Sequence, residues 1–589
     1  MSLLAQRRER SVAQLDKFRT ARYGGERLNN DDLVEAKLFG SLAYAWKVRP
    51  GANAPIPQLL LGVDGRYPLT LPRVLLPEPA HWHLRIPHVS REGTVCVLPE
   101  QATGDARQIH EVADHMIRRA VTTIEDGISG KNRADFLAEA ESYWAGATSD
   151  GATPVWSLIK PAPPSREISC VECQGFLVAG NSPEECRLWM RNYARCVPRS
   201  ITSGVFVWTK RGIFPDDYFE SNGELLAFLA AEDPGLLAKL SKLADGKRSR
   251  IPVVIAMQTP NGPALLAVSL NDFARKPSAK LNGFRPGALP PALFAKRCER
   301  DASTRHIVRR IYPEWIHSRG GAKGMSALAQ KKITLIGCGA LGCEVANMLA
   351  KAGLQQLMLV DGDRLDWDNI GRHLLGARDV GKNKATALRD HLLGQLPHLE
   401  IAAEACAWEQ LLESKSAPFA GSDLVISLTG EWASESALNT LAKSRSRPPV
   451  LFGWIEPHGY AGHALLVAAR GGCLACGRNE FGEVRHKVTD WKHSQLEPVP
   501  ACGGFYEPYG AAETAPIKSM LCSLAIETLL KNICHSELRT WIGNVSLVEA
   551  LGGEIAPLWR GQVEDRTIIG RIVRQEWPIH PQCEQCREP

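Results

Sequence analysis

Three glycines that follow a short apolar run mark a place where this chain could bind a nucleotide. Gly337, Gly339 and Gly342 come directly after the run 333–336, which has the composition of a buried parallel strand, and precede a predicted helix over 344–351. Glycines let the backbone turn tightly and approach a phosphate, and the first turn of a helix offers free N–H groups to an anion. This pattern alone predicts a site for either a dinucleotide or ATP.

The polar residues that follow the glycines discriminate between these two ligands. A second apolar run ends on Asp361, where an acid can accept a hydrogen bond from a ribose hydroxyl, and Asp363, Asn369, Arg372 and Lys384 come after it. A hydride-transfer enzyme has no use for a fixed Asn, Arg and Lys here, whereas an enzyme that acts on the α-phosphate of ATP must neutralise phosphoryl charge. The sequence therefore favours ATP, and the alternative is an ordinary nucleotide-binding crossover with solvated charges.

Two Cys-x-x-Cys pairs in the last third of the chain predict a metal site. Each pair presents two thiolates from one turn, and two such pairs complete the tetrahedral four-sulfur set that suits zinc. Such a site has no open coordination position, so we expect a structural role that fixes the second pair onto the domain. Two exposed redox pairs are the alternative, but no thioredoxin-like context surrounds them. The predicted ligands are Cys473, Cys476, Cys583 and Cys586.

Two further cysteines are candidates for acyl chemistry. Cys502 lies among prolines and glycines in a predicted loop before the helix 516–531, and a loop cysteine can approach an activated acyl group. Cys96 follows Gly93 closely, so a turn is expected to leave its thiol partly exposed. The alternative for a lone cysteine is a buried structural position. A third pair, Cys170 and Cys173, has no obvious partner pair and is predicted to be structural.

Composition limits the class of protein. A chain of 589 residues, 44% hydrophobic and 23% charged, is typical of a soluble protein with about three to four domains. The net charge of +6 and the lack of a long Lys/Arg block give no support to nucleic-acid binding. We find no secretory signal and no apolar stretch of membrane length. Sixteen cysteines in such a chain indicate a reducing cytoplasm, where thiols serve metal binding or chemistry.

The elements that must position these residues divide the chain into four segments. The segment 1–147 has a predicted strand at 59–63, a proline-rich stretch and helices at 109–124 and 134–144, and 148–165 has the composition of a linker. Strands and helices alternate over 166–305, which lacks a glycine loop, and 306–589 carries the glycines and the cysteine pairs. The predicted fold is a multidomain α/β protein.

The pattern from Gly337 to Lys384 resembles the adenylation domain of the ubiquitin-activating family, which includes the ThiF-type adenylyltransferases of thiamine and molybdopterin synthesis. The resemblance implies that Asp361 binds the ribose, that Asn369, Arg372 and Lys384 bind the phosphates, and that Cys502 lies in the crossover loop that holds a thioester cysteine. ATP, magnesium and a structural zinc are the cofactors that it implies.

Two details of that family are open in this chain. The family often has an Asp that helps to hold magnesium where Gly430 stands here, so Glu431 is one candidate, and phosphates with waters are the other. In related domains an arginine from the lead-in segment reaches a neighbouring nucleotide site. Arg309 or Arg310 could do so, and a solvated helix face is the alternative.

The first segment resembles the ubiquitin-conjugating enzyme fold, in which strands, a proline-rich stretch, His…Gly-x-x-Cys and helices follow one another. This resemblance makes Cys96 a thioester cysteine. Eukaryotic members carry His-Pro-Asn where this chain has His88-Val89-Ser90, so the oxyanion donor is unassigned. Because related activating enzymes are built from paired adenylation folds, we expect 166–305 to be a degenerate, inactive adenylation half.

Together these segments resemble bacterial fusions of ubiquitin-conjugating-like and ubiquitin-activating-like domains found beside cGAS-like nucleotidyltransferases in antiphage operons. The resemblance implies ATP-dependent activation of the nucleotidyltransferase C-terminus, a thioester relay from Cys502 to Cys96, transfer to a target amine, a homodimer and an antiviral role. Two alternatives stay open. A sulfur-carrier adenylyltransferase would leave 1–147 without a role, and a non-catalytic nucleotide-binding scaffold would not need Cys502.

Overall fold

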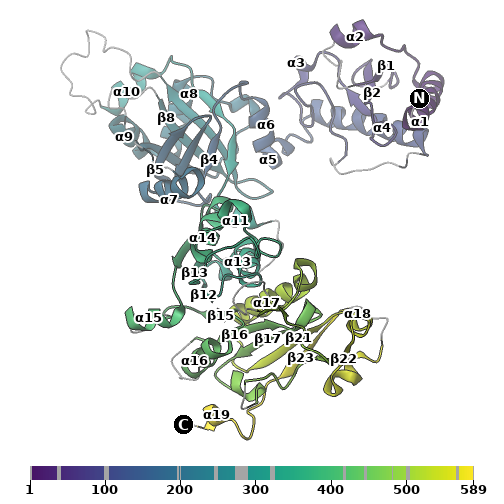
Figure 1. Cartoon of the computed structure of the whole chain (residues 1–589). Helices are drawn as coiled ribbons and strands as arrows, with labels where there is room; N and C mark the ends of the chain where they lie inside the picture. The colour runs from purple at the N-terminus through teal and green to yellow at the C-terminus, as the bar shows by residue number, and fades with distance from the viewer. Residues whose placement is uncertain are drawn as a thin grey trace. The chain divides into compact units, whose positions relative to one another are not determined.

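The structure is a computed structural model of the chain (Figure 1). It describes residues 3–35, 42–52, 54–98, 105, 107–195, 198, 200–243, 250–271, 290–318, 325–414, 419–442, 448–479, 482–498, 505–565 and 570–587. The chain forms two compact units, one of residues 1–186 with 200–310 and the other of residues 187–199 with 311–589. None of the helices in the described ranges is both long and apolar enough to cross a bilayer.

The first unit begins with a small α+β layer. An antiparallel sheet of three strands, in the order β1-β2-β3, packs with two long helices around Trp46, Leu61 and Ile117. The predicted strand over 59–63 coincides with β2, and the predicted helix from 109 extends to Ile128. The elements are α1 (Leu3–Tyr23), α2 (Asn30–Glu35), β1 (Tyr44–Val48), β2 (Leu59–Val63), β3 (Arg73–Leu75), α3 (Pro79–Trp82) and α4 (Ile109–Ile128).

A second sheet of the first unit has eight strands in the order β10-β9-β8-β7-β5-β6-β4-β11. Its strands are β4 (Val155–Ser157), β5 (Arg166–Cys173), β6 (Phe176–Gly180), β7 (Thr202–Thr209), β8 (Arg250–Met257), β9 (Ala264–Asn271), β10 (Thr304–His306) and β11 (Val308–Arg310). The helices in this part of the chain are α5 (Asp135–Ala138), α6 (Ala140–Gly146), α7 (Pro183–Ala194), α8 (Asn222–Glu232), α9 (Pro234–Leu243) and α10 (Pro291–Cys298). Apolar residues of α8, α9 and α10 share a core with alternate residues of β7, β8 and β9.

The structure changes the predicted limits of these segments. The expected linker 148–165 contains β4, because Val155 is buried and Trp156 stacks on Phe176 with ring centroids 4.0 Å apart. The two strands at 304–310 also belong to the eight-stranded sheet, so the first unit extends past the predicted boundary at 305. Trp144, expected in the first segment, lies in the core of this sheet and donates a hydrogen bond to the carbonyl of His306.

The second unit is built on a sheet in the order β14-β13-β12-β15-β16-β17-β21-β23. The first five strands are parallel to their neighbours and the remaining pairings are antiparallel. The strands are β12 (Lys332–Ile336), β13 (Gln356–Val360), β14 (Glu400–Glu404), β15 (Leu424–Ser427), β16 (Val450–Ile455), β17 (Ala461–Val467), β21 (Glu537–Ile542) and β23 (Arg571–Glu576). Among the strands described in the first unit, no such parallel run occurs, so its sheet gives no support to a degenerate adenylation half.

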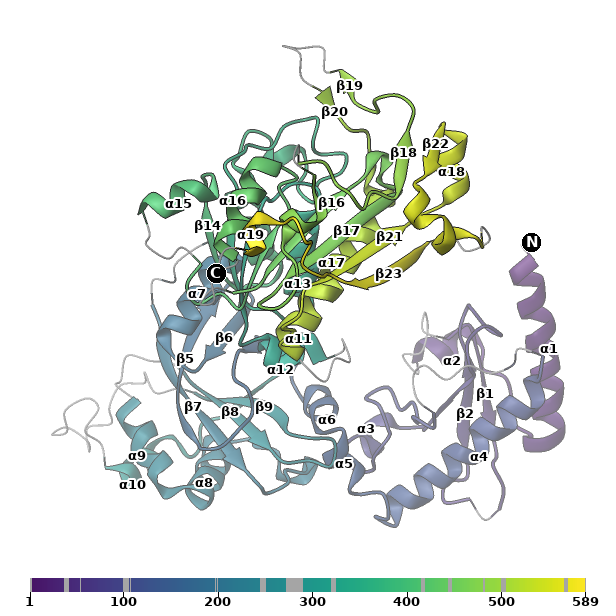
Figure 2. The ribbon, with the colours of Figure 1, turned by 90° about the horizontal axis from the view of Figure 1, so that it is seen from below.

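Alternation along the central strands explains their continuous apolar sequence. Ile333 and Leu335 of β12 enter one core, while Ile336 enters a second core on the other face of the sheet. Parallel strands covered on both faces need apolar residues at every position. Residues of α13, α14 and α17 fill the first core, and residues of α15 and α16 fill the second. Helix α14 is labelled in Figure 1 and the other four helices in Figure 2.

The helices and minor strands of the second unit complete it. They are α11 (Pro313–His317), α12 (Met325–Leu328), α13 (Gly342–Lys351), α14 (Lys384–Gln395), α15 (Trp408–Ser414), α16 (Trp432–Ala442), β18 (Thr489–Trp491), β19 (Glu497–Pro498), β20 (Phe505–Tyr506), α17 (Ala511–Lys531), α18 (Val545–Ala550), β22 (Gly553–Ile555) and α19 (Glu584–Arg587). Helix α13 confirms the helix predicted after the glycines. Helix α17 begins five residues before Pro516, where the sequence predicted its start.

Candidate functional site

A cavity of about 270 Å³ opens at the carboxyl ends of β12, β13 and β15. This is the edge of a parallel sheet at which ligands bind in α/β folds. Its lining includes six of the residues singled out from the sequence, which are Gly337, Gly339, Asp361, Asp363, Lys384 and Glu431. The structure therefore brings the glycine loop, the acids after the second strand and the lysine into one site.

Local geometry explains why each of the three loop positions is a glycine. Gly337 has a φ of +87°, in the left-handed region that favours glycine, and its N–H donates to the carbonyl of Val360. A Cβ on Gly342 would lie 1.9 Å from the carbonyl oxygen of Gly337, so only glycine lets α13 start this close to the loop. Around Gly339 nothing described lies within 4 Å of the place of a Cβ. That open space is where a phosphate can approach the backbone.

Asp361 fastens the loop to the next strand end. One carboxylate oxygen accepts from the N–H of Cys338 at 2.6 Å and the other accepts from the N–H of Asp363 at 2.7 Å. Burial raises the pKa of Asp361, and these two hydrogen bonds oppose that rise. Because both oxygens already accept backbone N–H groups, this residue shapes the loop in addition to any contact with a ribose.

Lys384 and Asp363 place a charge pair in the cavity. The Lys384 ammonium lies 3.0 Å from a carboxylate oxygen of Asp363, whose side chain is 76% exposed, whereas that of Lys384 is 12% exposed. Asn383 fixes this arrangement: it caps α14 by accepting from Thr386 N–H and donates to the carbonyls of Asp361 and Asp363. Sequence analysis missed Asn383, although Asn directly before a helix is a capping signal.

His373 is a second supporting residue that sequence analysis missed. Its Nε2 donates to the carbonyl of Cys338 at 2.7 Å, because its Nδ1 already accepts from the N–H of Leu375. Burial lowers the pKa of His373, which favours the neutral ring that this arrangement requires. The side chain therefore holds the glycine loop from the segment that follows Arg372.

Asn369 and Arg372 lie outside the cavity of the glycine loop. The Asn369 side chain accepts from the N–H of Asp366, and the Arg372 guanidinium lies over the ring of Tyr509, 5.0 Å from its centroid. Arg372 instead lines a separate cavity of about 460 Å³ together with Tyr460, Tyr506 and Glu513. In this structure the two predicted phosphate ligands are therefore not assembled with Lys384.

Acidic side chains line the far wall of the cavity. Glu409 and Glu431 join Asp363 there, and Gly430 has a φ of +67° at the exit turn of β15. Glu435, fully buried beneath this turn, accepts from the N–H of Gly430 and the hydroxyl of Thr429, both at 3.3 Å. Burial raises the pKa of Glu435 to about 7, so its carboxyl titrates near neutral pH.

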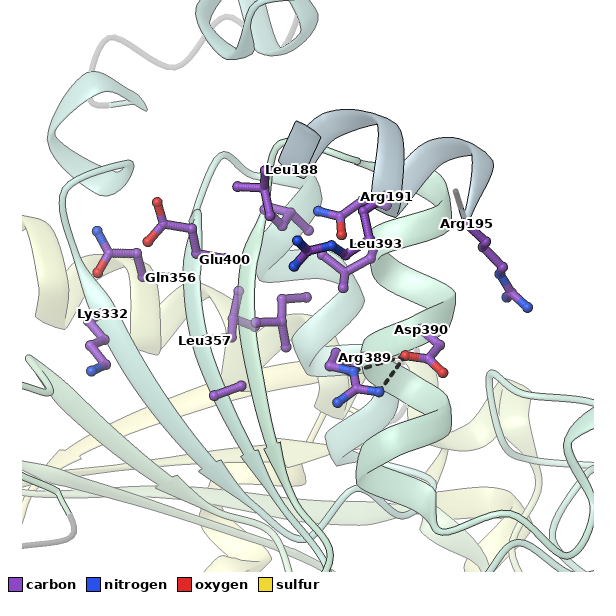
Figure 3. A pocket seen from close by; sticks show the side chains of 14 residues that line it. Leu188, Arg191, Arg195, Lys332, Gln356, Leu357, Arg389, Asp390, Leu393 and Glu400 are labelled. Atoms are coloured by element: carbon purple, nitrogen blue, oxygen red, sulfur yellow. Dashed lines mark hydrogen bonds and ion pairs between the residues drawn. The ribbon is translucent and has the colours of Figure 1, made fainter. Parts of the chain in front are cut away.

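A larger cavity, about 750 Å³, lies at the amino ends of β12, β13 and β14 (Figure 3). It is lined by the first residues of β12, β13 and β14 and by Arg191, Arg195 and Arg389. None of the residues predicted to bind a nucleotide lines it. Its position at the amino ends and the lack of a glycine loop distinguish it from the nucleotide cavity.

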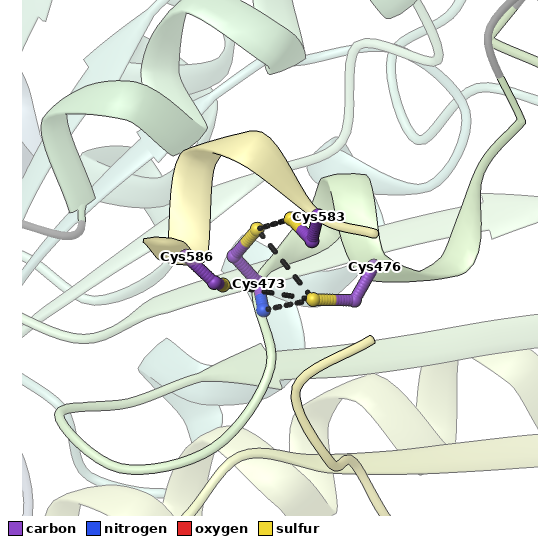
Figure 4. A group of neighbouring side chains, drawn as sticks. All are labelled: Cys473, Cys476, Cys583 and Cys586. Carbon is purple, nitrogen blue, oxygen red and sulfur yellow. Dashed lines mark hydrogen bonds between the residues drawn. The ribbon is translucent and has the colours of Figure 1, made fainter. Parts of the chain in front are cut away.

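The four paired cysteines come together in the second unit (Figure 4). Cys473 Sγ lies 3.9 Å from Cys476 Sγ and 3.6 Å from Cys583 Sγ, and Cys476 Sγ lies 3.6 Å from Cys586 Sγ. A tetrahedral zinc with bonds of about 2.3 Å needs sulfurs about 3.8 Å apart, whereas a disulfide needs about 2.05 Å. The geometry therefore fits a metal ion held by four thiolates.

Backbone groups and one tryptophan surround this cysteine cluster. The N–H groups of Cys473 and His580 donate to the sulfur of Cys476 at 3.3 and 3.4 Å. Trp577 donates from its ring nitrogen to the carbonyl of Cys473, and its ring lies where a Cβ on Gly477 would be. Such contacts orient metal ligands and, in this fold, fasten the segment after β23 to the sheet.

Cys96 lies in the first unit and is exposed, as the sequence predicted. Gly93 makes the preceding turn with a φ of +84°. The N–H of Cys96 donates to the carbonyl of His88 at 2.7 Å, and the N–H of His88 donates to the hydroxyl of Tyr143 at the same distance. An exposed thiol after a turn can exchange acyl groups, which a buried one cannot.

Cys502 lies outside the described residues. The short strands β19 and β20 pair on either side of the segment 499–504 that contains it, with Pro498 opposite Phe505 (Figure 2). Of the two lead-in arginines, Arg310 forms an ion pair with Glu141 and donates to the carbonyl of Pro263 within the first unit. Its side chain is only 11% exposed, so Arg309 is the more accessible of the two.

Two regions of the chain match models of known protein families. Residues 315–551 match the model of the ThiF family, and residues 23–152 match that of prokaryotic E2 family B. The ATP-dependent ubiquitin transferase-like protein Cap2 of Pseudomonas aeruginosa is 26% identical over 496 residues, 78% of this chain and 82% of that protein. The Vibrio cholerae Cap2 is 26% identical over 508 residues, 78% of this chain and 83% of that protein. The mouse adenylyltransferase and sulfurtransferase MOCS3 is 34% identical over 131 residues, 22% of this chain and 26% of that protein.

The chain therefore carries a ThiF-family domain and a domain of prokaryotic E2 family B. Its similarity to Cap2 proteins extends over more of the chain than either domain alone, whereas its similarity to MOCS3 covers about a fifth.

Proposed function

We propose that this protein is an ATP-dependent conjugating enzyme that activates the C-terminus of a partner protein and transfers it to an amine. The observation that carries this proposal is the presence, on one chain, of the nucleotide cavity around Lys384 and of the exposed Cys96 in an E2-type domain. A sulfur-carrier adenylyltransferase would need the nucleotide cavity but not the exposed Cys96. The extent of the similarity to Cap2 also favours conjugation.

The proposed chemistry has four steps. The partner's C-terminal carboxylate attacks the α-phosphorus of ATP, and pyrophosphate leaves. In this proposal Lys384 neutralises the charge that develops on the phosphates, and the open space around Gly339 accommodates them. The Cys502 thiolate attacks the acyl carbon and AMP leaves, and the Cys96 thiolate then displaces Cys502. Finally an amine nitrogen takes the acyl group, Cys96 leaves as thiolate, and the amine loses a proton.

Arg372 and Asn369 can contact the phosphates in this proposal only after their segment moves. In the described structure Arg372 stacks on Tyr509, so a role on the phosphates requires the segment 366–372 to move toward the glycine loop. The family pattern that places both residues on ATP supports such a movement. Asp361 and Asp363 are already at the cavity and need none.

Two metal ions fit the residues present. Asp363 and Glu431 offer the carboxylate oxygens that magnesium prefers, and magnesium would supply further charge neutralisation for the phosphates. The four sulfurs of the cysteine cluster fit zinc, whose role there is to hold the fold together. The closed four-thiolate set leaves no coordination position for a substrate.

The partner that we propose is a cGAS-like nucleotidyltransferase, and the setting that we propose is antiviral defence. Both follow from the resemblance to the bacterial fusions, as does a homodimer. The segment 166–305 is proposed as an inactive half on the same ground alone, since its strand order differs from that of the second unit.

A relay experiment tests the function. The full chain, ATP and a candidate nucleotidyltransferase are mixed, and mass spectrometry after limited proteolysis locates thiol-labile adducts. Cys502→Ala should form the acyl-adenylate without a thioester, while Cys96→Ala should accumulate a thioester on Cys502, because each alanine removes only one nucleophile. If Cys96 still becomes loaded in Cys502→Ala, the relay is wrong and Cys96 is the direct acceptor.

A further inference from the structure

His88 occupies an unusual position beside Cys96. Its φ of +63° lies in the left-handed region, which is unfavourable for a residue with a side chain. Two hydrogen bonds hold it there, one from its N–H to the hydroxyl of Tyr143 and one to its carbonyl from the N–H of Cys96. Strained residues that their surroundings hold in place cluster at functional sites.

The backbones of His88 and Cys96 lie side by side. Val89 and Val95 form an antiparallel bridge, and the N–H of Cys96 donates to the carbonyl of His88 at 2.7 Å. Tyr143 lies in the same place. Burial raises the pKa of its hydroxyl, and the charges of Glu139 and of the Cys96 thiolate act in the same direction.

One carboxylate, that of Asp135, orients the imidazole of His88. Its Nε2 lies 2.9 Å from a carboxylate oxygen of Asp135, whereas its Nδ1 lies 3.8 Å from the nearest oxygen of Glu139, which is beyond hydrogen-bond distance. Because an ionised carboxylate can only accept, Nε2 carries the proton in the neutral ring and Nδ1 keeps its lone pair. A histidine oriented by an acid in this manner is suited to accept a proton.

We propose that His88 is the general base for the last step, taking the proton from the amine that attacks an acyl group on Cys96. The amine nitrogen adds to the thioester carbonyl, the C–S bond breaks, Cys96 leaves as thiolate, and the proton passes to His88 Nδ1 and then to solvent. Asp135 is a positioning residue that fixes the ring. The inference rests on the proposed function only in that Cys96 carries an acyl group.

The test supplies that acyl group without ATP or a partner, so it does not depend on whether adenylation occurs. The full chain is treated with N-acetylglycine benzyl thioester, excess reagent is removed, and Nα-acetyllysine is added. Mass spectrometry of the peptide that contains Cys96 follows loading and discharge at several pH values. The variant is His88→Asn, because Asn tolerates the left-handed region better than other non-glycine residues. His81→Asn, at an exposed position of α3, is the matched control.

We expect His88→Asn to load Cys96 as the wild type does but to discharge to Nα-acetyllysine about 10²-fold or more slowly. Its pH profile should lose the inflection of a histidine, and added imidazole should restore part of the rate. Asp135 and Glu139 are the charged groups beside this ring, Tyr143 and Cys96 contact the backbone of His88, and His83 is bonded to the adjacent Val89 carbonyl. A purely structural histidine would give neither the altered profile nor the rescue.

A second variant keeps the test decisive if His88→Asn folds poorly. Asp135→Asn leaves the backbone of His88 untouched and should slow discharge and shift its pH profile while Cys96 still loads. The proposal is overturned if His88→Asn discharges within twofold of wild type, if Asp135→Asn keeps the wild-type rate and profile, or if Cys96 of the wild type does not take the acyl group.

Discussion

The cysteine cluster and the nucleotide cavity lie in the same unit but differ in how their polar groups are satisfied. In the cluster, every one of the four sulfurs faces another sulfur, and three of the four cysteines are buried. In the cavity, Gly339 faces open space and the side chain of Asp363 is 76% exposed. The first arrangement is complete once a metal is bound, whereas the second is incomplete without a ligand. On the proposed function, the first is a site that stabilises the fold and the second is one that performs chemistry.

The largest expected effect is on the cysteine cluster. Cys583→Ser should release the metal and lower the free energy of unfolding by several kcal/mol, because binding to a structural site contributes about 10–16 kcal/mol to folding in small zinc domains. Metal analysis and denaturant unfolding measure the two effects. Cys534→Ser, at an exposed cysteine of the same unit, is the control and should change neither. If the wild type held less than one zinc per chain, the cluster would not be a structural zinc site and the comparison with the cavity would fail.

An intermediate effect is expected at the cavity, and it should be on rate rather than on stability. Lys384→Ala should slow partner-dependent ATP–pyrophosphate exchange by about 10²–10³-fold, because it removes a cation aimed at developing phosphate charge. Unfolding should change little. The control is Lys382→Ala. Lys382 lies in the same segment, and its ammonium pairs with Asp379 at 2.8 Å. Exchange at the wild-type rate in Lys384→Ala would contradict the assignment.

The smallest effect is expected at Glu435, which lies between the two regions. It is buried under the cavity turn, and Arg478, two residues after the cluster ligand Cys476, acts on its charge. Its pKa is about 7 in the folded protein and 4.5 as the ordinary value. The folded protein thus keeps a proton that the unfolded chain has lost between these values. Stability contributed by this group therefore falls as pH rises from 4.5 to about 7 and is constant above.

Replacing that carboxyl with an amide should remove the pH dependence. Glu435→Gln should match the wild type near pH 4 and exceed its unfolding free energy by up to about 3 kcal/mol at pH 8, at about 1.4 kcal/mol per pKa unit. Denaturant unfolding at several pH values measures this. Glu431→Gln, on the exposed side of the same turn, should follow the wild-type curve. If the unfolding free energies of Glu435→Gln and the wild type changed with pH in the same way, the buried carboxyl would not be the source of the pH dependence.

Much of the second unit could be predicted from the sequence because its signals are local. The strand before Gly337 and the helix after Gly342 follow from apolar periodicity and the glycine spacing, and the structure confirms both. The four sulfurs also assemble as predicted, since the two pairs have spacings that make each a bidentate ligand. These features depend on residues close together in the chain or on chemistry with few alternatives.

The rest depends on contacts between distant residues, which carry no local signal. The stacking of Arg372 on Tyr509 and the hydrogen bond between His88 and Asp135, 47 residues apart, are of this kind. So is the hydrogen bond from the N–H of Val488 to the buried carboxylate of Glu456, 32 residues apart. The strand within the expected linker was missed because prolines and glycines dominate the composition of the segment 148–165. Val155 and Trp156 nevertheless form a strand there and pack well.

The spacing of the cysteine cluster has a consequence for how the protein is made. Cys473 and Cys583 are 110 residues apart, and β21 and β23 of the sheet lie in the intervening segment. At about 5–20 residues per second, the first pair of thiols leaves the ribosome roughly 5–20 s before the second. During that interval the first pair offers only two thiolates, which is half of the four-sulfur set. A metal ion, as proposed for this cluster, can therefore be enclosed by four thiolates only after Cys583 and Cys586 have been synthesised.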